Sequence, residues 1–245
     1  MTMLMGFPGA GAGKNVFAVW QDRLGDEIAF REILHNRRFT DPVCETMDEA
    51  AERCVKEVLS VCGEEQDLFF FGHCMGANTA YETAKRLAKD HGRNIRGLFF
   101  SAFISPDMPI HDGISHLDDK AFAEEIRSHG TFPDEFFVKP AVLKLFLPKI
   151  KADYRLIEAY CDTEHYVLDC PFAGFFGTED ESVTEEGIRG WEKYTCHEFR
   201  KFYFPGNHYF YYDHQEEIID RIVELIGEFR RRDDGIQEKQ YGRDD

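Results

Sequence analysis

A cysteine stands between two glycines in Gly72-His73-Cys74-Met75-Gly76. The apolar run before this segment is typical of a buried strand, and Met75–His91 has the spacing of an amphipathic helix. Strand, tight turn and helix form the context of a G-x-S-x-G nucleophile elbow, here with cysteine in place of serine. Side chains at Gly72 and Gly76 would collide across such a turn. The pattern therefore predicts that Cys74 is a nucleophile.

The predicted turn also favours the chemistry of a thiol. It places the Cys74 sulfur at a helix N-terminus, where the helix dipole stabilises a thiolate. The backbone N–H of Met75 then points toward the same pocket and can donate to an oxyanion. Gly9-Ala10-Gly11 follows the first apolar run, and its small residues predict a second donor at Ala10 or Gly9. We interpret His73 as a pocket-wall residue.

Two later motifs offer an acid and a base. An apolar run at 172–176 is followed by Glu179, Asp180 and Glu181, and a carboxylate just past a strand end can orient a histidine. His208 lies in Phe204-Pro205-Gly206-Asn207-His208, after the last candidate strand, and could act as general base or as the imidazolium partner of a thiolate. The order nucleophile, acid, histidine is that of the α/β hydrolases.

Alternating apolar runs and amphipathic stretches must position these residues. Such alternation predicts an α/β layered structure, and nearly continuous apolar runs are typical of strands in a parallel sheet. We expect strands at Leu4–Phe7, Ile28–Leu34, Asp67–Gly72, Ile95–Ile104, Phe172–Gly177 and Glu198–Phe204. We expect helices at Asn15–Leu24, Asp48–Cys62, Met75–His91, Glu185–Tyr194 and His214–Arg230.

The alternation stops between residues 105 and 169, where the pattern is helical. Helices are expected at Asp118–His129, at Pro140–Leu147 and, after a break at Pro148, from Lys149 to about Tyr160. We predict a core of residues 1–104 and 170–230, with 105–169 as a helical lid over the active edge of the sheet. The charged segment 231–245 is expected to be disordered.

Composition narrows the classes of function. The 245 residues are 43% hydrophobic and 14% aromatic, enough for a folded core, and the net charge is −17. That charge argues against binding to nucleic acids or anionic membranes. We expect a cytoplasmic protein, because no signal peptide or membrane span is visible and the seven cysteines are scattered without a CxxC pair. Neither a disulfide framework nor a metal site is expected.

A phosphate-loop interpretation of residues 6–15 fails. In the frame that starts at Gly6, the position that needs lysine is Ala12. In the frame that ends at Gly13-Lys14, Pro8 replaces the first glycine and Asn15 replaces the hydroxyl residue. The sequence therefore argues against ATP binding at this loop.

Together, these motifs resemble the type II thioesterases of nonribosomal peptide and polyketide synthesis. The resemblance runs from about Leu4 to Phe210 and is carried by LMGFPGAGAG, FFFGHCMGA, LFLPKIKADYRLIEAY, DCPFAGFFGTEDESV and FPGNHYF. It implies an α/β-hydrolase fold with a mobile helical lid. It also implies hydrolysis of acyl groups from the phosphopantetheine arm of a carrier protein, with no cofactor besides the arm that the substrate carries.

The resemblance also assigns residues. Cys74 takes the position of the nucleophile, Asp180 that of the acid in G-x-x-D-x-x-V, and His208 that of the base. Ala10 and Met75 take the oxyanion positions. The sequence departs from the family at three places: cysteine replaces serine at 74, Gly9 stands where an aromatic residue is usual, and residues 35–41 lack the usual Pro-Gly-rich loop.

The cysteine leaves two reactions open. Its acyl-enzyme is itself a thioester and stays reactive, so the acceptor could be water, which makes a thioesterase, or a second carrier thiol or an amine, which makes an acyltransferase. We favour hydrolysis because the length and the lid are like those of the hydrolytic family. A binding module on an inactive α/β-hydrolase fold is the alternative without catalysis. Lysines in the lid, Lys144 and Lys151 among them, are candidates for contact with an acyl- or peptidyl-carrier protein.

Overall fold

The computed structural model describes residues 1–11, 17–36, 41–63, 66–111, 113–128, 132 and 134–241. A six-stranded sheet forms its centre, with the order β2-β1-β3-β4-β5-β6 and every neighbouring pair parallel. The parallel α/β sheet that the sequence predicts is confirmed. Its strands are β1 (Thr2–Phe7), β2 (Ile28–Glu32), β3 (Asp67–His73), β4 (Gly97–Ser101), β5 (Phe172–Gly177) and β6 (Phe199–Phe204).

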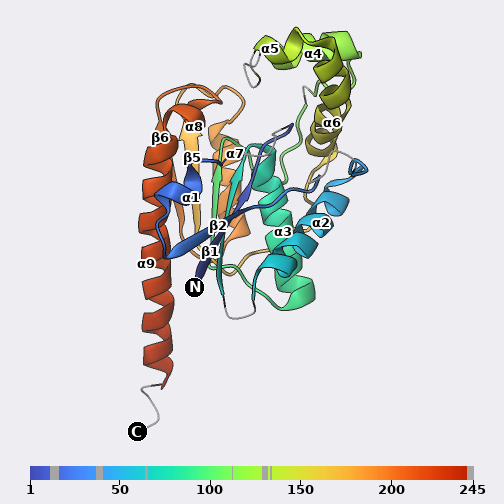
Figure 1. The fold of residues 1–245 in the computed structure, drawn as a ribbon. Helices are drawn as coiled ribbons and strands as arrows, with labels where there is room; N and C mark the ends of the chain where they lie inside the picture. The colour runs from blue at the N-terminus through green and yellow to red at the C-terminus, as the bar shows by residue number, and fades with distance from the viewer. Residues whose placement is uncertain are drawn as a thin grey trace.

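Helices cover both faces of the sheet (Figure 1). On one face, α2 (Met47–Val61) and α3 (Met75–His91) pack over a core that contains Phe70 and Phe100. On the other, α1 (Trp20–Arg23), α8 (Phe210–Asp213) and α9 (Gln215–Tyr241) pack over a core that contains Phe69, Phe71 and Phe99. Successive strand residues point to opposite faces, so a strand buried on both sides must be apolar throughout.

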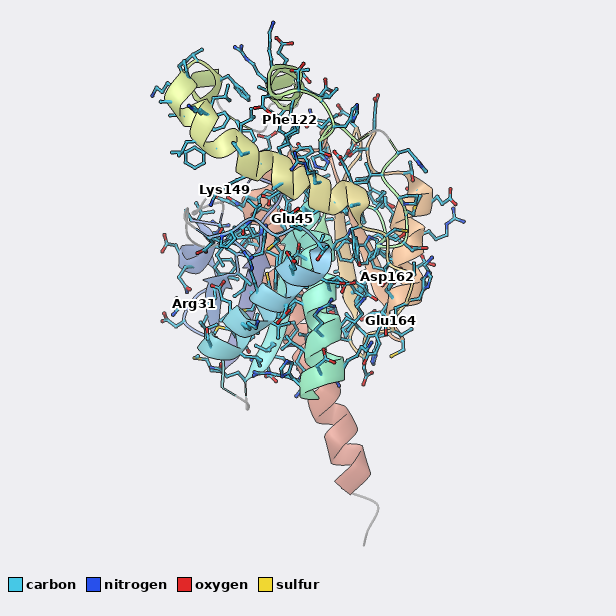
Figure 2. The ribbon with its side chains drawn as sticks, turned by 90° about the vertical axis from the view of Figure 1, so that its right-hand side faces the viewer. Arg31, Glu45, Phe122, Lys149, Asp162 and Glu164 are labelled. Atoms are coloured by element: carbon cyan, nitrogen blue, oxygen red, sulfur yellow. The ribbon has the colours of Figure 1, made fainter. Side chains whose placement is uncertain are left out.

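Three helices follow β4 and precede β5 in the sequence: α4 (Asp119–Ser128), α5 (Asp134–Phe137) and α6 (Pro140–Ala159). In space they stand over the ends of the strands, at one end of the sheet (Figure 1). They share a small apolar cluster of their own, in which the labelled Phe122 of Figure 2 lies. We call α4, α5 and α6 the lid helices. The chain leaves the lid along α3, where Asp162 forms a buried ion pair with Lys85 at 3.0 Å (Figure 2).

The lid differs from the prediction at two points. Helix α6 passes through Pro148 without ending, whereas the sequence predicts two helices separated there. Proline removes one backbone hydrogen bond, but Leu147 and Ile150 on either side of it are buried, and this packing holds both halves in line. The short helix α5 is also absent from the prediction.

The C-terminal segment is helical as well. Helix α9 continues to Tyr241, whereas the sequence predicts disorder over 231–245. Glutamate, lysine, glutamine and arginine favour helix, so a charged segment can extend a helix that packing has already started. Residues 242–245 lie outside the described residues. Two further elements, α7 (Glu185–Gly190) and the 3₁₀ helix η1 (Trp191–Tyr194), precede β6.

None of the described helices combines the length and the apolar character that a membrane crossing requires.

Candidate active site

The turn after β3 has the geometry of a nucleophile elbow. Cys74 stands between β3 and α3 with φ 52° and ψ −126°, a backbone conformation that is costly for a residue with a side chain. A Cβ at Gly72 would lie 2.2 Å from the backbone oxygen of Gly76, and a Cβ at Gly76 would lie 1.9 Å from the backbone oxygen of Phe7. Only glycine fits at both positions, and the strained cysteine is held between them.

Two other strand ends bring an acid and a base to the same edge. Asp180 follows β5 and His208 follows β6, and their Oδ2 and Nδ1 atoms lie 2.8 Å apart. The Asp180 side chain is 2% exposed, whereas that of His208 is 25% exposed. Because Asp180 occupies Nδ1, the other ring nitrogen is left for a partner on the open side of the ring.

The charges of this group are coupled. Burial by itself lowers the pKa of His208, but hydrogen bonding and charge from Asp180 and Cys74 outweigh it and raise this pKa to about 10. Burial raises the pKa of Asp180, and the bonds from His208 and Ser182 outweigh it, so the net shift is downward. At neutral pH the arrangement therefore favours an imidazolium between a carboxylate and the sulfur.

Ser182 belongs to this group, although the sequence analysis did not select it. Its backbone N–H donates to Asp180 Oδ1 at 3.0 Å, and its hydroxyl lies 2.5 Å from the same oxygen and 3.1 Å from His208 Nδ1. A serine two residues after an aspartate is a common turn partner. The spacing Asp-x-Ser was thus the available signal, and here the serine fixes the carboxylate that faces the histidine.

His73 supports the turn from behind. Its Nδ1 lies 2.7 Å from the Ser101 hydroxyl and its ring stacks on Tyr211 with centroids 4.6 Å apart. Burial, and then the positive charge of His208, lower the pKa of His73 to about 3. A ring that stays neutral and packed in this way forms part of the wall.

A cavity of about 790 Å³ opens above these residues. Cys74, Asp180 and His208 line it from the core, while Tyr154 and Ile157 line it from helix α6. Five carboxylates line it and no lysine or arginine does among the described residues; they are Glu125, Glu158, Glu179, Asp180 and Glu181. The site is therefore a partly acidic pocket between sheet edge and lid.

The segments that carry the predicted oxyanion donors flank Cys74. Ala10 and Gly9 line the cavity, and a Cβ on Gly9 would lie only 3.3 Å from the Cβ of Cys74. Met75 is the first residue of α3, a position whose N–H has no partner within the helix. Both candidate N–H groups thus belong to segments that flank Cys74.

The remaining candidates fall elsewhere. Glu179 and Glu181 line the cavity, but the carboxylate that contacts His208 is that of Asp180. Lys144 is exposed on α6. Lys151 is 9% exposed, and its ammonium group binds the Leu117 carbonyl and Asp119 at 3.2 Å. The helix thus turns the Lys151 side chain inward, and its contact with a carrier stays a prediction.

A second group of polar residues lies apart from the cavity. Asp169, Cys196 and His197 are exposed, and their potential ligand atoms lie within 4.8 Å of one another. These three residues precede β5 and β6, whereas Asp180 and His208 follow these parallel strands. The group therefore lies at the amino ends of the strands, and the cavity lies at their carboxyl ends. Asp169 already accepts a hydrogen bond from His197 at 2.8 Å. The group cannot take part in chemistry at Cys74.

Comparison with known proteins gives a consistent match. Residues 2–226 match the thioesterase domain family. Thioesterase PikA5 of Streptomyces venezuelae is 28% identical over 226 residues, which cover 91% of this chain and 80% of that protein.

Solved structures agree over nearly the same range. The crystal structure of ClbQ from the colibactin NRPS/PKS pathway has a TM-score of 0.87 and 30% identity, covering 94% of this chain and 98% of that one. The RedJ thioesterase from the prodiginine pathway of Streptomyces coelicolor has a TM-score of 0.82 and 32% identity, and the match covers 91% of this chain and 85% of that one.

Proposed function

This chain belongs to the thioesterase family and is a hydrolase of thioesters, and from that premise we propose that it is an editing type II thioesterase. In this proposal it removes acyl or aminoacyl groups from the phosphopantetheine arm of carrier proteins in nonribosomal peptide or polyketide synthesis. The predicted α/β-hydrolase fold and the family resemblance are both confirmed by the matches.

One observation carries the proposed mechanism. Cys74 sits strained at the elbow, in the cavity that Asp180 and His208 also line, and His208 is held by Asp180 at 2.8 Å. We assign Cys74 as nucleophile, His208 as proton carrier and Asp180 as the residue that orients the ring.

Acylation begins with the thiolate. The Cys74 sulfur attacks the carbonyl carbon of the bound thioester, and the N–H groups of Ala10 and Met75 stabilise the oxyanion. The bond between carbonyl carbon and pantetheine sulfur then breaks, and His208 donates its proton to the leaving sulfur. The products are the free pantetheine thiol and an acyl group on Cys74, with His208 neutral.

Deacylation follows because acylation removes a charge. The acylated sulfur is neutral, so one of the two groups that raise the pKa of His208 is lost. The neutral ring can then accept a proton from water, whose oxygen attacks the acyl carbon. Cleavage of the bond to Cys74 releases the acid and restores the thiolate and the imidazolium.

The same intermediate supports a second candidate, acyl transfer. Cys74 forms a thioester with the acyl group, and its exchange with another thiol is nearly isoenergetic. Water, a second carrier thiol or an amine could therefore accept the acyl group. We rank hydrolysis first because residues 2–226 match the thioesterase domain family and the chain is 28% identical to Thioesterase PikA5.

The lining of the cavity limits which acyl groups the enzyme would accept. Its carboxylates would repel an acyl group that carries a carboxylate of its own. Glu158, for example, accepts hydrogen bonds from the backbone N–H groups of Ile114 and Ser115 at 2.7 and 3.0 Å, which hold its carboxylate in place. Neutral acyl groups and aminoacyl groups fit this lining better than dicarboxylic ones.

We propose that the carrier docks on the exposed side of the lid. Lys144 is exposed there beside Leu145 and Phe146, whose exposed fractions are 48% and 42%, and Val138 at 64% lies nearby in sequence. An exposed cation on a segment that also exposes apolar side chains suits an acidic carrier or the phosphate of its arm. The proposal needs no cofactor besides that arm. We also propose a cytoplasmic location, in line with seven cysteines that are scattered along the sequence without a CxxC pair.

The experiment mixes an acyl-loaded carrier with an empty second carrier and enzyme, and weighs both carriers intact by mass spectrometry. We expect the acyl mass to leave the first carrier as free acid, and Cys74→Ala to abolish this release while the protein stays folded. Acyl mass on the second carrier without free acid would establish the transferase instead. Full release by Cys74→Ala would remove Cys74 from the mechanism, and no release by the wild type from any acyl- or aminoacyl-carrier would refute the proposal.

A further inference from the structure

A buried carboxylate on the lid bonds two loops of the core. Asp153 lies on helix α6 and is 8% exposed. Its Oδ2 accepts a hydrogen bond from the backbone N–H of Gly11 at 2.9 Å, and its Oδ1 lies 2.9 Å from Nε2 of His35. Both carboxylate oxygens are therefore used, each on a different core segment.

One of these segments carries a proposed oxyanion donor. Gly11 directly follows Ala10 and has a φ of +68°, a conformation that favours glycine. A Cβ on Gly11 would lie 2.9 Å from Ile150 of the lid, just as a Cβ on Gly9 would lie 3.3 Å from Cys74. The loop is thus packed between the nucleophile on one side and helix α6 on the other.

The other segment anchors the carboxylate to the core. His35 follows β2, and its side chain is 11% exposed. Arg53 of α2 holds the same loop by donating to Asn36 Oδ1 at 3.1 Å and to the Pro42 carbonyl at 2.6 Å. Residues 35–41 are where this sequence departs from its family's Pro-Gly-rich loop, and the departure supplies the histidine that faces Asp153.

We propose that Asp153 is a positioning residue that sets the oxyanion hole when the lid is docked. By fixing the N–H of Gly11 it fixes the plane of the peptide between Ala10 and Gly11, and so it restrains the short loop that also carries the Ala10 N–H. His35 contacts the other oxygen of the Asp153 carboxylate and so keeps the carboxylate oriented toward the Gly11 N–H. The proposal rests on the proposed function and adds that seating of the lid and assembly of the oxyanion hole are one event.

The chemistry of Cys74 offers a readout that separates positioning from general damage. Attack on a thioester builds an oxyanion and needs the Ala10 N–H, whereas alkylation by iodoacetamide displaces iodide and builds none. The hydrogen bonds of Asp153 go to Gly11 and His35 and not to the groups that activate the sulfur. Loss of Asp153 should therefore slow acylation and spare alkylation.

The test measures both rate constants on the same preparations of full-length protein. Acylation is followed in single turnover with propionyl-pantetheine, which removes carrier docking from the experiment, and alkylation with iodoacetamide. For Asp153→Ala we expect acylation to fall about 10- to 100-fold, since loss of a whole oxyanion donor costs about 10²- to 10³-fold, with alkylation within about threefold of wild type. Asp153→Asn keeps the volume and one acceptor, so it should recover part of the rate.

Lys151→Met is the matched control, because it removes a lid contact on the same helix that does not reach the loop. We expect it to leave the ratio of the two rates unchanged. A parallel fall of both rates in Asp153→Asn and Asp153→Ala, or no fall in either, would overturn the positioning role. Failure of the proposed function looks different: the wild-type enzyme would then release no propionic acid from propionyl-pantetheine.

Discussion

The core side and the lid side of the cavity hold their residues in different ways. On the core side, Cys74, Asp180 and His208 follow the ends of parallel strands, and the backbone of a packed sheet fixes their places. On the lid side, α6 places Asp153 and Glu158 through hydrogen bonds to segments more than 40 residues away in sequence. The core fixes the reacting atoms, and the lid completes their surroundings through contacts that can be broken without unfolding the sheet.

The sharpest test of the core side removes the charge of its buried acid. In Asp180→Asn the amide cannot stabilise the imidazolium, so we expect kcat to fall by about 10²- to 10⁴-fold with the fold intact. Glu181→Gln, next in sequence, lies on the cavity wall without contact to the ring and should stay within about threefold. Equal losses in the two variants would break the assignment of the acid.

The same variant makes a prediction about pH. The wild-type pKa of His208 is raised to about 10, so its ring is protonated below that pH and loses its proton above it. Removing the carboxylate in Asp180→Asn should move the titration midpoint of the ring downward, as NMR of the imidazole can measure. An unchanged midpoint would show that Asp180 does not support the imidazolium.

A second test of the core side concerns the elbow. Gly76→Ala places a methyl group 1.9 Å from the backbone oxygen of Phe7, where neither strand nor helix can move away. We expect the free energy of unfolding to fall by about 3 kcal/mol or more, measured by denaturant titration. Gly63→Ala is the control, because its Cβ would meet nothing within 4 Å; its unfolding free energy should change by about 0.5 kcal/mol at most.

A smaller loss of activity is expected when one of the two Ser182 hydrogen bonds to Asp180 is removed. Ser182→Ala removes the hydroxyl that lies 2.5 Å from Asp180, while the backbone N–H bond to the same oxygen remains. We expect kcat to fall about tenfold or less, consistent with the loss of one hydrogen bond to a charged group, and Ser182→Thr to restore it. A loss as large as that of Asp180→Asn would mean that the serine does more than orient the carboxylate.

The smallest effect belongs to the outer surface of the lid. Lys144→Glu should raise KM for a loaded carrier about two- to fivefold. A charge at the rim of an interface affects the rate at which the carrier associates more than it affects the chemical step. KM for propionyl-pantetheine should not change, and Lys56→Glu, an exposed lysine of α2, should change neither. If KM for the carrier also stays constant in Lys144→Glu, the carrier docks elsewhere.

The sequence predicted the core side better than the lid side, for a physical reason. The elbow, the acid loop and the histidine loop are short motifs beside apolar strands, and the observed strand bounds lie within three residues of the predicted ones. Ser182 is a local partner that a turn motif could have indicated. By contrast, the continuous α6 through Pro148, the inward turn of Lys151 and the bond from Gly11 to Asp153 depend on tertiary packing between distant segments.

The central claim is that the acyl group passes through the sulfur at the elbow. Its most direct test mixes wild-type protein with an acyl-loaded carrier, quenches within milliseconds to seconds in acid, and maps any added mass by peptide mass spectrometry. We predict one acyl group on the peptide that contains Cys74, sensitive to hydroxylamine as a thioester is, and absent from Cys74→Ala. Product formed without any acyl mass on Cys74, or with the mass on another residue, would contradict the account.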